Sequence, residues 1–545
     1  MTNTLSISLA QLNLTVGDVP GNTAAIVAAI DAAKSEQSAN LVVFQELALC
    51  GYPPEDLLFH SGMAQRVAES IATINESTSG IAALVGYPEY ADGKIFNSAV
   101  WLEDGKVRGN YRKRSLPNYG VFDERRYFTE GDAELVLDVA GVNIGVTICE
   151  DIWASSAVAQ ASVDQGAELI VAINGSPFQF NKQKARENLL ATRAAETGVP
   201  YLYQNMVGGQ DELVFDGGSC AVNSRGEVCL RAPAFDAGIF PVEFARTDTG
   251  KIEALSGSTC ALPEAVSNIY KGILRGVKDY VTKNGFEGVV LGLSGGIDSA
   301  LCLTIAVDAL GASAVQAIMM PYRYTSDMSM EDAEKQAALL GVDYQILPIE
   351  AMVEASNKTL ADYFAGVQKD ATEENIQARC RGIVLMAISN KTGRMVLTTG
   401  NKSEMAVGYA TLYGDMAGGF APIKDCTKTL VYELARYRNT LSEAIPLRVI
   451  EREPSAELSP DQKDSDSLPP YSVLDAILDA LMMEDLSVDE IAARGFDRET
   501  VGKVLDMVRR NEYKRRQSPP GVRISGRAFG RDWRYPITSG YGRKK

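Results

Sequence analysis

One short segment, residues 289–311, constrains the fold of this chain more than any other part of it. Residues 289–293 are an apolar run typical of a buried strand, and residues 299–310 are an apolar run of helical length that ends before Gly311. The turn between them is Ser294-Gly-Gly-Ile-Asp298. Its glycines allow backbone N–H groups to approach an anion, and the following helix points its positive end at the same place. The segment therefore predicts a strand–turn–helix unit that binds phosphate.

The turn differs from the Walker type, which requires Gly-Lys-Ser or Gly-Lys-Thr, because it contains no lysine. Asp298 instead suits a magnesium ion bound to the phosphates. A glycine-rich turn alone also fits any tight strand-to-helix connection. The complete Ser-Gly-Gly-x-Asp-Ser string, however, resembles the pyrophosphate loop of the N-type ATP pyrophosphatases, which adenylate a substrate and release pyrophosphate. The resemblance implies that ATP binds to Gly292, Leu293, Ser294, Gly295, Gly296, Ile297, Asp298 and Ser299.

The sequence around this turn alternates between strand and helix patterns. Residues 315–320 and 395–399 are predicted to be parallel strands, and residues 329–340 a helix between them. Residues 265–284 are predicted to be a helix that precedes the unit. The alternation indicates an open, Rossmann-like parallel sheet with its ligands at the carboxyl ends of the strands.

Size and composition narrow the class of protein. A chain of 545 residues is too long for one hydrophobic core, so two or more domains are expected. The net charge of −17 argues against general nucleic-acid binding. The start lacks a signal-peptide pattern, and no apolar run is long enough to span a membrane. The eight cysteines are scattered without a Cys-x-x-Cys pair, which suits reduced thiols. We therefore expect a cytoplasmic protein with no membrane or nucleic-acid partner.

The first part of the chain also alternates between short strands and helices. Residues 5–10 and 41–44 are predicted to be strands, and residues 22–34 a helix. Asp104-Gly105 is a hairpin signal. Further strands are predicted at residues 81–86, 97–102, 142–149 and 169–174, and a further helix at residues 182–197.

The chain has a single histidine, His60. It is expected to be a partly buried surface residue, and one histidine can hardly anchor a metal site. A covalent mechanism would need another base, which disfavours Ser-His-Asp and papain-like schemes.

Three side chains then stand out: Glu46 and Cys149, each at the end of a predicted strand, and Lys113 in the segment Asn110-Tyr-Arg-Lys-Arg-Ser-Leu-Pro117. Each alone fits a solvated strand end or a core position. Together they resemble the Glu-Lys-Cys triad of the nitrilase (carbon–nitrogen hydrolase) superfamily. The likeness extends through residues 46–54, 113–124 and 149–153, and it covers roughly residues 1–250. It implies a nitrilase-like α-β-β-α sandwich and amidase chemistry.

The chemistry of such a triad is coherent. A thiol with a pKa of about 8.5 needs a neighbouring charge or base to become a nucleophile. Glu46 would take the proton of Cys149, and Lys113, with a backbone N–H after Cys149, would stabilise the oxyanion. Glu124 would be a second, supporting carboxylate. By resemblance to the glutaminases of the superfamily, glutamine binds to Tyr119, Ser176 and Lys182.

The C-terminal half carries a second resemblance. Residues 401–404, 373–379 and 511–516, together with residues 321–326, look like the NAD synthetase family over roughly residues 265–545. The resemblance implies that Asp298 and Glu404 hold Mg²⁺ and that Thr399 lies near the adenosine. It further implies that Asn375, Glu404 and Lys514 contact deamido-NAD.

An amidase placed before an NAD synthetase is the architecture of the glutamine-dependent NAD synthetases, which the whole chain resembles. This implies a glutaminase domain at residues 1–250, a linker at 251–264 and a synthetase domain at 265–545. It implies that the substrates are glutamine, ATP and deamido-NAD, that the chain forms a homo-oligomer, and that ammonia passes between the two sites inside the protein. The acidic, proline-containing segment at residues 452–470 is expected to be a mobile loop.

Two other classes of function stay open at this stage. The chain could be another ATP-pyrophosphatase amidotransferase, although asparagine synthetases use an N-terminal cysteine where this chain has Thr2, and GMP synthetases need a Cys-His pair. It could also be a nucleotide sensor whose residues 509–545 bind nucleic acid, since these hold twelve Lys and Arg against two Asp and Glu. The proline, glycine and aromatic residues of this tail favour an ordered segment that docks on phosphates or an acidic surface.

Overall fold

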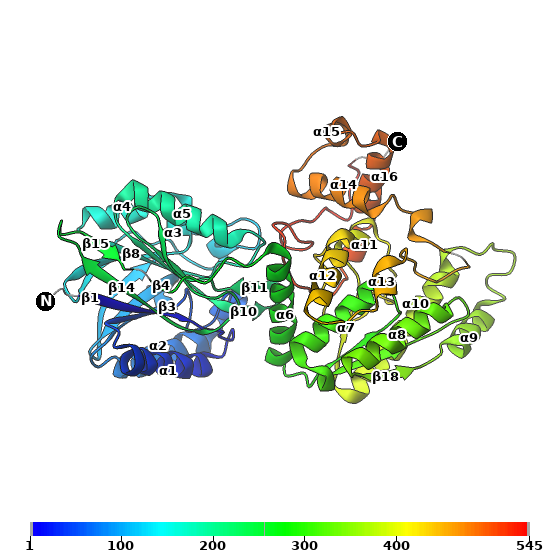
Figure 1. The fold of residues 1–545 in the computed structure, drawn as a ribbon, viewed down its shortest axis with the longest axis horizontal. Coiled ribbons are helices and arrows are strands. Elements are labelled where there is room, and N and C mark those ends of the chain that lie inside the picture. Colours follow the sequence, from blue (N-terminus) through cyan, green and yellow to red (C-terminus); the bar gives the residue numbers. More distant parts are fainter. Residues whose placement is uncertain (1–3, 256, 461, 542–545) are drawn as a thin grey trace. The chain divides into compact units, whose positions relative to one another are not determined.

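The computed structural model describes residues 4–255, 257–460 and 462–541 (Figure 1). The chain divides into two compact units, Met1–Ala265 and Val266–Lys545. Each unit is α/β, and each has its own sheets and its own hydrophobic core.

The first unit is built on two large sheets. In sheet order, the seven-stranded sheet contains β15 (Ile252–Ala254), β14 (Gly238–Arg246), β1 (Thr4–Gln11), β2 (Leu41–Val43), β3 (Ala82–Ala91), β4 (Lys94–Glu103) and β5 (Lys106–Arg112). The six-stranded sheet contains β13 (Val228–Arg231), β12 (Cys220–Val222), β9 (Tyr201–Asn205), β8 (Leu169–Asn174), β7 (Val142–Ile148) and β6 (Val136–Val139). A separate hairpin pairs β10 (Val207–Gln210) with β11 (Leu213–Asp216).

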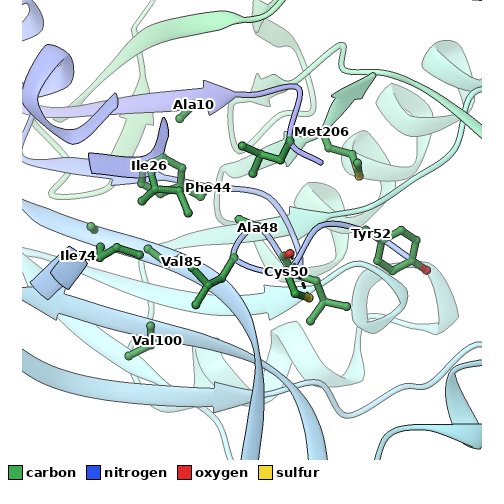
Figure 2. Packing of buried hydrophobic residues seen from close by; sticks show 14 of the residues in the cluster. Ala10, Ile26, Phe44, Ala48, Cys50, Tyr52, Ile74, Val85, Val100 and Met206 are labelled. Atoms are coloured by element: carbon green, nitrogen blue, oxygen red, sulfur yellow. Dashed lines mark hydrogen bonds between the residues drawn. The ribbon is translucent and has the colours of Figure 1, made fainter. Parts of the chain in front are cut away.

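Helices cover the outer face of each sheet (Figure 1). Helices α1 (Val19–Gln37) and α2 (Ser61–Glu76) pack on the seven-stranded sheet, where Ile26 and Ile74 share a cluster with Val85. Figure 2 shows part of this cluster around Phe44. The helices on the six-stranded sheet are α3 (Glu150–Ala154), α4 (Ala157–Asp164) and α5 (Lys182–Thr197). The first unit is therefore an α-β-β-α sandwich, as predicted.

Strand β2 shows why its sequence is apolar throughout. Its side chains alternate between the two faces of the sheet. Val42 joins the cluster under α1 and α2, whereas Leu41 and Val43 join the cluster between the two sheets. Because both faces are covered, every position of this strand is apolar. The charged residue Glu46 follows only after the strand has ended.

The second unit contains a four-stranded parallel sheet in the order β18 (Asp343–Ile346), β17 (Val315–Met319), β16 (Val289–Gly292) and β19 (Met395–Leu397). Its first helices are α6 (Ala265–Lys283), α7 (Ile297–Leu310), α8 (Asp327–Leu340), α9 (Glu350–Leu360) and α10 (Ala371–Thr392). Those that follow β19 are α11 (Lys402–Val407), α12 (Lys428–Leu441), α13 (Leu447–Glu451), α14 (Tyr471–Met483), α15 (Val488–Ala493), α16 (Arg498–Arg510) and α17 (Glu512–Arg515). The predicted parallel-sheet fold is confirmed.

Most predicted elements are present, with small shifts at their ends. Asp104 and Gly105 connect β4 to β5 with φ angles of 49° and 71°, which is the backbone of the predicted hairpin turn. Strand β15 was not predicted, since residues 252–254 fall in the expected linker, yet they pair with β14. Strand β18 was also not predicted, because it is a largely exposed edge strand without an apolar pattern.

The C-terminal segment lies against its own unit. The Asp425 carboxylate accepts hydrogen bonds from the backbone N–H groups of Ile524 and Ser525, and Lys402 Nζ donates to Ser525 Oγ at 2.9 Å. Phe529 and Trp533 enter a cluster with side chains of α11, α14 and α16. The described part of the tail is thus an ordered packing element.

Across the described ranges, every helix is too short or too polar to cross a membrane.

Candidate active sites

Cys149 occupies the sharp turn between β7 and α3. Its backbone has φ 45° and ψ −97°, a conformation that is strained for any residue with a Cβ. The Cys149 N–H donates to the carbonyl of Ile173 at 3.0 Å, which holds the turn against the neighbouring strand β8. This strained residue is the one whose sulfur was predicted to attack the substrate.

The other two predicted triad residues meet beside this turn. Lys113, directly after β5, places its Nζ 2.7 Å from Glu46 Oε1 and 2.8 Å from Glu124 Oε2. Lys113 and Glu46 are fully buried, and Glu124 is 5% exposed. Three groups that lie far apart in sequence therefore form one buried carboxylate–ammonium–carboxylate array.

Two further donors fix the Glu46 carboxylate. Asn97 Nδ2 donates to Glu46 Oε1 at 2.7 Å, and the backbone N–H of Gly175 donates to Oε2 at 2.7 Å. Tyr52 O–H donates to Glu124 Oε1 at 3.1 Å. Each carboxylate of the array is thus held by neutral donors as well as by Lys113, which restricts its orientation.

Burial and charge set the resting protonation of this cluster. Burial raises the pKa of the Cys149 thiol well above its usual range, and the carboxylate of Glu46 adds to the effect. Burial alone would lower the pKa of Lys113, but Glu124 and Glu46 outweigh it and hold that pKa well above its usual range. Burial raises the pKa of Glu124 to about 7, although Lys113 opposes the rise. The resting site therefore holds a neutral thiol beside a charged ammonium, so the thiol needs a base.

The predicted glutamine ligands lie next to the same turn. Tyr119 O–H donates to Glu150 Oε2 at 2.9 Å, and Lys182 Nζ lies 3.9 Å from the centre of the Trp153 ring. Glu150 and Trp153 belong to α3, which begins directly after Cys149. Tyr119 and Lys182 thus reach the helix that follows the nucleophile.

Ser176 follows Gly175, whose N–H binds Glu46. Arg186, which is fully buried, donates to the Ser176 carbonyl at 2.9 Å and to Ser176 Oγ at 3.3 Å. Asp216 accepts from Arg186 Nη1 at 2.8 Å and keeps the guanidinium in place. Arg186 and Glu150 were not predicted as site residues, although the sequence shows that a carboxylate, Glu150, directly follows the predicted nucleophile.

A small recess beside Glu124 is lined by Tyr52, Phe122, Glu124 and Leu213, among others. His60 takes no part in this lining; it is exposed and caps α2, with its Nδ1 accepting from Gly62 N at 3.4 Å. The expectation that His60 is partly buried was wrong, because an N-cap position leaves the ring in solvent. The exclusion of histidine from the chemistry does not depend on that point.

In the second unit, the glycine-rich turn connects β16 to α7. Gly295 has φ 79°, and a Cβ at this position would lie 2.3 Å from the backbone oxygen of Ser329. Ser294 Oγ lies 3.0 Å from Ser299 Oγ and accepts from the N–H of Gly296 at 3.2 Å. The helix begins at Ile297, two residues earlier than predicted, so Asp298 is in its first turn.

Asp298 and Glu404 converge on one buried ammonium group. Lys428 Nζ forms ion pairs with Asp298 Oδ2 and, at 3.0 Å, with Glu404 Oε1. Asn401 Nδ2 donates to Asp298 Oδ1 at 2.9 Å, and Asn401 Oδ1 accepts from Glu404 N at 3.0 Å. Lys428 is 2% exposed. Lys428 and Asn401 were missed as partners, because nothing in the local sequence shows that they meet Asp298.

In this cluster, as in the first, burial and neighbouring charges shift the pKa values in opposite directions. Burial raises the pKa of Glu404 to about 8, with Asp298 adding to the rise and Lys428 opposing it. Burial alone would lower the pKa of Lys428, but the two carboxylates hold it above its usual range. The cluster is therefore built to hold positive charge between Asp298 and Glu404.

The remaining predicted nucleotide ligands surround the loop after α11. Asn375 Oδ1 accepts from Thr411 Oγ1 at 2.8 Å, and Lys514 Nζ donates to the carbonyls of Gly408 and Ala410, both at 2.8 Å. Thr399 follows β19 and is half-buried. A small recess next to this loop is lined by Gly400, Met405, Ala410 and Asp415, among others. Asn375, Lys514 and α11, which carries Glu404, are thus gathered around one loop.

The segment at residues 452–470 touches the glycine-rich turn and the start of α8. Arg452 donates to the Gly295 carbonyl, and Glu457 accepts from Ser326 Oγ at 2.8 Å and from Ser329 Oγ at 2.7 Å. A 3₁₀ turn forms at Asp464–Asp466. Residue 461 lies outside the described residues, and the mobility of the segment stays a prediction.

Comparisons with known proteins match both parts of the chain. The carbon-nitrogen hydrolase family matches residues 6–254, and the NAD synthase family matches residues 269–518. The chain is 48% identical over 537 residues to the glutamine-dependent NAD(+) synthetase of Acinetobacter baylyi, covering 98% of both chains. It is 45% identical over 569 residues to that of Thermotoga maritima, again covering 98% of both.

Solved structures of glutamine-dependent NAD(+) synthetases also match the whole chain. The glutamine-dependent NAD+ synthetase of Acinetobacter baumannii, in complex with ADP, is 45% identical with a TM-score of 0.80, and the match covers 99% of this chain and 100% of that one. The enzyme of Cytophaga hutchinsonii superposes with a TM-score of 0.85 over 98% of both chains. Its identity of 23% shows a shared fold alone.

Proposed function

Because the chain belongs to the glutamine-dependent NAD(+) synthetases, we propose that its first compact unit hydrolyses glutamine and its second makes NAD. Glutamine gives glutamate and ammonia, deamido-NAD is adenylated with ATP, and ammonia displaces AMP to give NAD. Pyrophosphate leaves in the adenylation step. The enzyme is thus a ligase that forms a carbon–nitrogen bond.

One observation carries the assignment of the first unit. The fully buried Lys113 ammonium lies between Glu46 and Glu124, at a turn where Cys149 adopts a strained backbone. Burying three charged groups is costly, and a stable fold alone would be served as well by apolar side chains. Such a cost is typical of a catalytic site.

We assign the steps of glutamine hydrolysis to this array. Glu46 accepts the Cys149 proton as the sulfur attacks the amide carbon, and Lys113 donates to the oxyanion that forms. Glu46 returns the proton to the leaving ammonia, which leaves a thioester. Glu46 then deprotonates water, which attacks the thioester and releases glutamate while the proton returns to the sulfur. Glu124 keeps Lys113 charged throughout.

Tyr119, Ser176 and Lys182 are proposed to hold the rest of the glutamine. Glu150, which Tyr119 already contacts, offers a carboxylate for an amino group, and Lys182 offers an ammonium for a carboxylate. Together they match the two opposite charges at the α-carbon of glutamine.

The glycine-rich turn of the second unit is proposed to bind ATP. Residues 292–299 supply backbone N–H groups and the N-terminal end of α7 to the phosphates, and Thr399 lies near the adenosine. Asn375, Glu404 and Lys514 are proposed to contact deamido-NAD around the loop at residues 408–411.

The donor set also fits Mg²⁺. Asp298 and Glu404 are two carboxylates already aimed at one cation, and Mg²⁺ with ATP commonly uses one or two carboxylates together with phosphate oxygens. A bound Mg²⁺ would neutralise charge on the phosphates. Asp298 and Glu404 would orient it, and Asn401 would hold the Asp298 carboxylate in place.

The proposal also covers the oligomeric state, the compartment and the transfer of ammonia. The chain works as a homo-oligomer in the cytoplasm, on small molecules alone, and ammonia passes to the second reaction without release. The eight free cysteines suit a reducing compartment.

Identification of all products tests the proposal. The full chain is incubated with glutamine, ATP, Mg²⁺ and deamido-NAD, and the products are separated and quantified. NAD, AMP, pyrophosphate and glutamate should appear in equal amounts. Turnover of a different carboxylate with ATP and glutamine, without NAD formation, would favour another ATP-pyrophosphatase amidotransferase.

A further inference from the structure

A third buried carboxylate, besides those of Glu46 and Glu124, lies beside the triad. Asp151 is the second residue of α3, two positions after Cys149, and it is fully buried. It accepts four hydrogen bonds: at Oδ1 from the backbone N–H groups of Arg114 (3.1 Å) and Ser115 (2.8 Å), and at Oδ2 from the backbone N–H of Ile148 (2.9 Å) and from Tyr111 O–H (2.7 Å).

These four donors flank two catalytic residues. Tyr111 lies two positions before Lys113, whereas Arg114 and Ser115 directly follow it. Ile148 directly precedes Cys149. One carboxylate therefore ties the chain on both sides of Lys113 to the turn that presents Cys149.

The sheets do not provide this connection. Lys113 follows β5, the last strand of the seven-stranded sheet, and Cys149 follows β7 in the six-stranded sheet. These strands share no backbone ladder, so sheet register does not fix the ammonium relative to the sulfur. Packing between the sheets and side-chain hydrogen bonds set that distance, and Asp151 accepts four such bonds.

A charged carboxylate suits this role better than an amide. It accepts at both oxygens, whereas the Nδ2 group of an asparagine would face hydrogen-bond donors instead of acceptors. Burial raises the pKa of Asp151, and the N–H of Ile148 and the O–H of Tyr111 oppose that rise. Removing one partner from a buried network leaves the other groups without hydrogen bonds. A substitution of Asp151 would therefore shift the turn that presents Cys149.

We propose that Asp151 is a positioning residue for glutamine hydrolysis, which holds the Lys113 ammonium at its working distance from the Cys149 sulfur. The proposal rests on the proposed function of the first unit. Asp151 touches neither the substrate nor the reacting atoms, so its effect acts entirely through Lys113 and Cys149.

The test compares Asp151→Asn with wild type in the full chain. A misplacement of about 1 Å can cost about 100-fold in rate, so kcat for glutamine hydrolysis should fall by about that factor. KM for glutamine should change less than about threefold, since Tyr119 binds Glu150 and Lys182 lies over the Trp153 ring, and the variant keeps both groups. NAD formation from ammonium, which uses the second unit, should stay unchanged. Asp164→Asn, an exposed carboxylate on α4, is the matched control.

A second readout separates positioning from mere stability. Lys113 lowers the pKa of the Cys149 thiol against the effect of burial. If Asp151→Asn displaces Lys113, the pH profile of Cys149 alkylation by iodoacetamide should move to higher pH. A purely structural role would lower the unfolding temperature and leave both the profile and kcat of the folded enzyme unchanged, which would overturn the proposal.

Tyr111→Phe provides an independent variant, and it decides alone if Asp151→Asn does not fold. It removes one of the four donors and keeps the ring. We expect a smaller fall in kcat, below about tenfold, with KM unchanged. An unchanged kcat would contradict the proposal. Wild type without any glutaminase activity would instead contradict the proposed function of the unit.

Discussion

At the scale of single residues, the active chemistry depends on a few buried charges with shifted pKa values. Glu124 lies against Lys113 and accepts from Tyr52, while Glu46 lies on the opposite side of the ammonium, and burial raises the pKa of Glu124 to about 7. A carboxyl group with a raised pKa is neutral below that value and charged above it. Below about pH 7, Lys113 therefore loses one of its two counter-charges.

This predicts an acidic limb in the pH profile of glutamine hydrolysis. kcat/KM should fall as the pH drops through about 7, and Glu124→Gln should lower kcat/KM at pH 8 and remove that limb. The measurement is glutamate release between pH 5.5 and 9 for wild type, for Glu124→Gln and for Glu130→Gln, an exposed control. A limb that persists in Glu124→Gln at the same pH would assign it to another group.

The carboxylates of the second unit give a separate prediction. Asp298→Asn and Glu404→Gln should each lower NAD formation by at least about 100-fold, because each removes a charge that would orient Mg²⁺ on the phosphates. The loss should be equal with glutamine and with ammonium as nitrogen donor. Asp343→Asn, on the exposed strand β18, should have no effect. Near-normal ammonium-driven rates in both variants would refute the assignment.

Sequence reasoning found most of these residues but not their partners. Glu46 and Cys149 follow apolar strands, and Asp298 follows a glycine-rich turn, so local patterns mark them. Lys113 follows the mostly exposed strand β5 and was found through the resemblance to the nitrilase superfamily. Lys428, in contrast, begins an ordinary amphipathic helix and meets Asp298 across 130 positions of sequence. Such a contact is set by the packing of helices and has no local signal.

At the scale of elements, several buried strands were predicted from their apolar runs, whereas others, such as β9 and β12, were missed although they are fully buried. Strands β2 and β8 are apolar, apart from Asn174 at the end of β8, because both of their faces are covered. Strand β18 presents mostly exposed residues, and β15 is only three residues long. Neither strand has an alternation of apolar and polar residues that distinguishes it from a loop.

The glycine-rich turn gives a prediction at this scale. Gly295→Ala should impair NAD formation with either nitrogen donor, because the new Cβ would lie 2.3 Å from a backbone oxygen that cannot move away as a side chain would. Glutamine hydrolysis should be retained. Both activities are measured alongside Gly393→Ala, which has a similar positive φ but no atom within 4 Å of the new Cβ. An equal loss in the two variants would attribute the effect to backbone strain alone.

At the scale of the whole molecule, the central claim is that two compact units carry two separable reactions. The first unit contains Glu46, Lys113 and Cys149, and the second contains Asp298 and Glu404. A substitution that removes the nucleophile should therefore abolish NAD formation from glutamine and leave NAD formation from ammonium intact. No single-site mechanism makes that distinction.

The most direct measurement is NAD formation by Cys149→Ala with glutamine and, separately, with ammonium as the nitrogen donor. Cys229→Ala, a half-exposed thiol of the same unit, is the control. The two-site account predicts that Cys149→Ala makes no NAD from glutamine and retains most of the wild-type rate with ammonium. An equal loss of rate with both donors would contradict it.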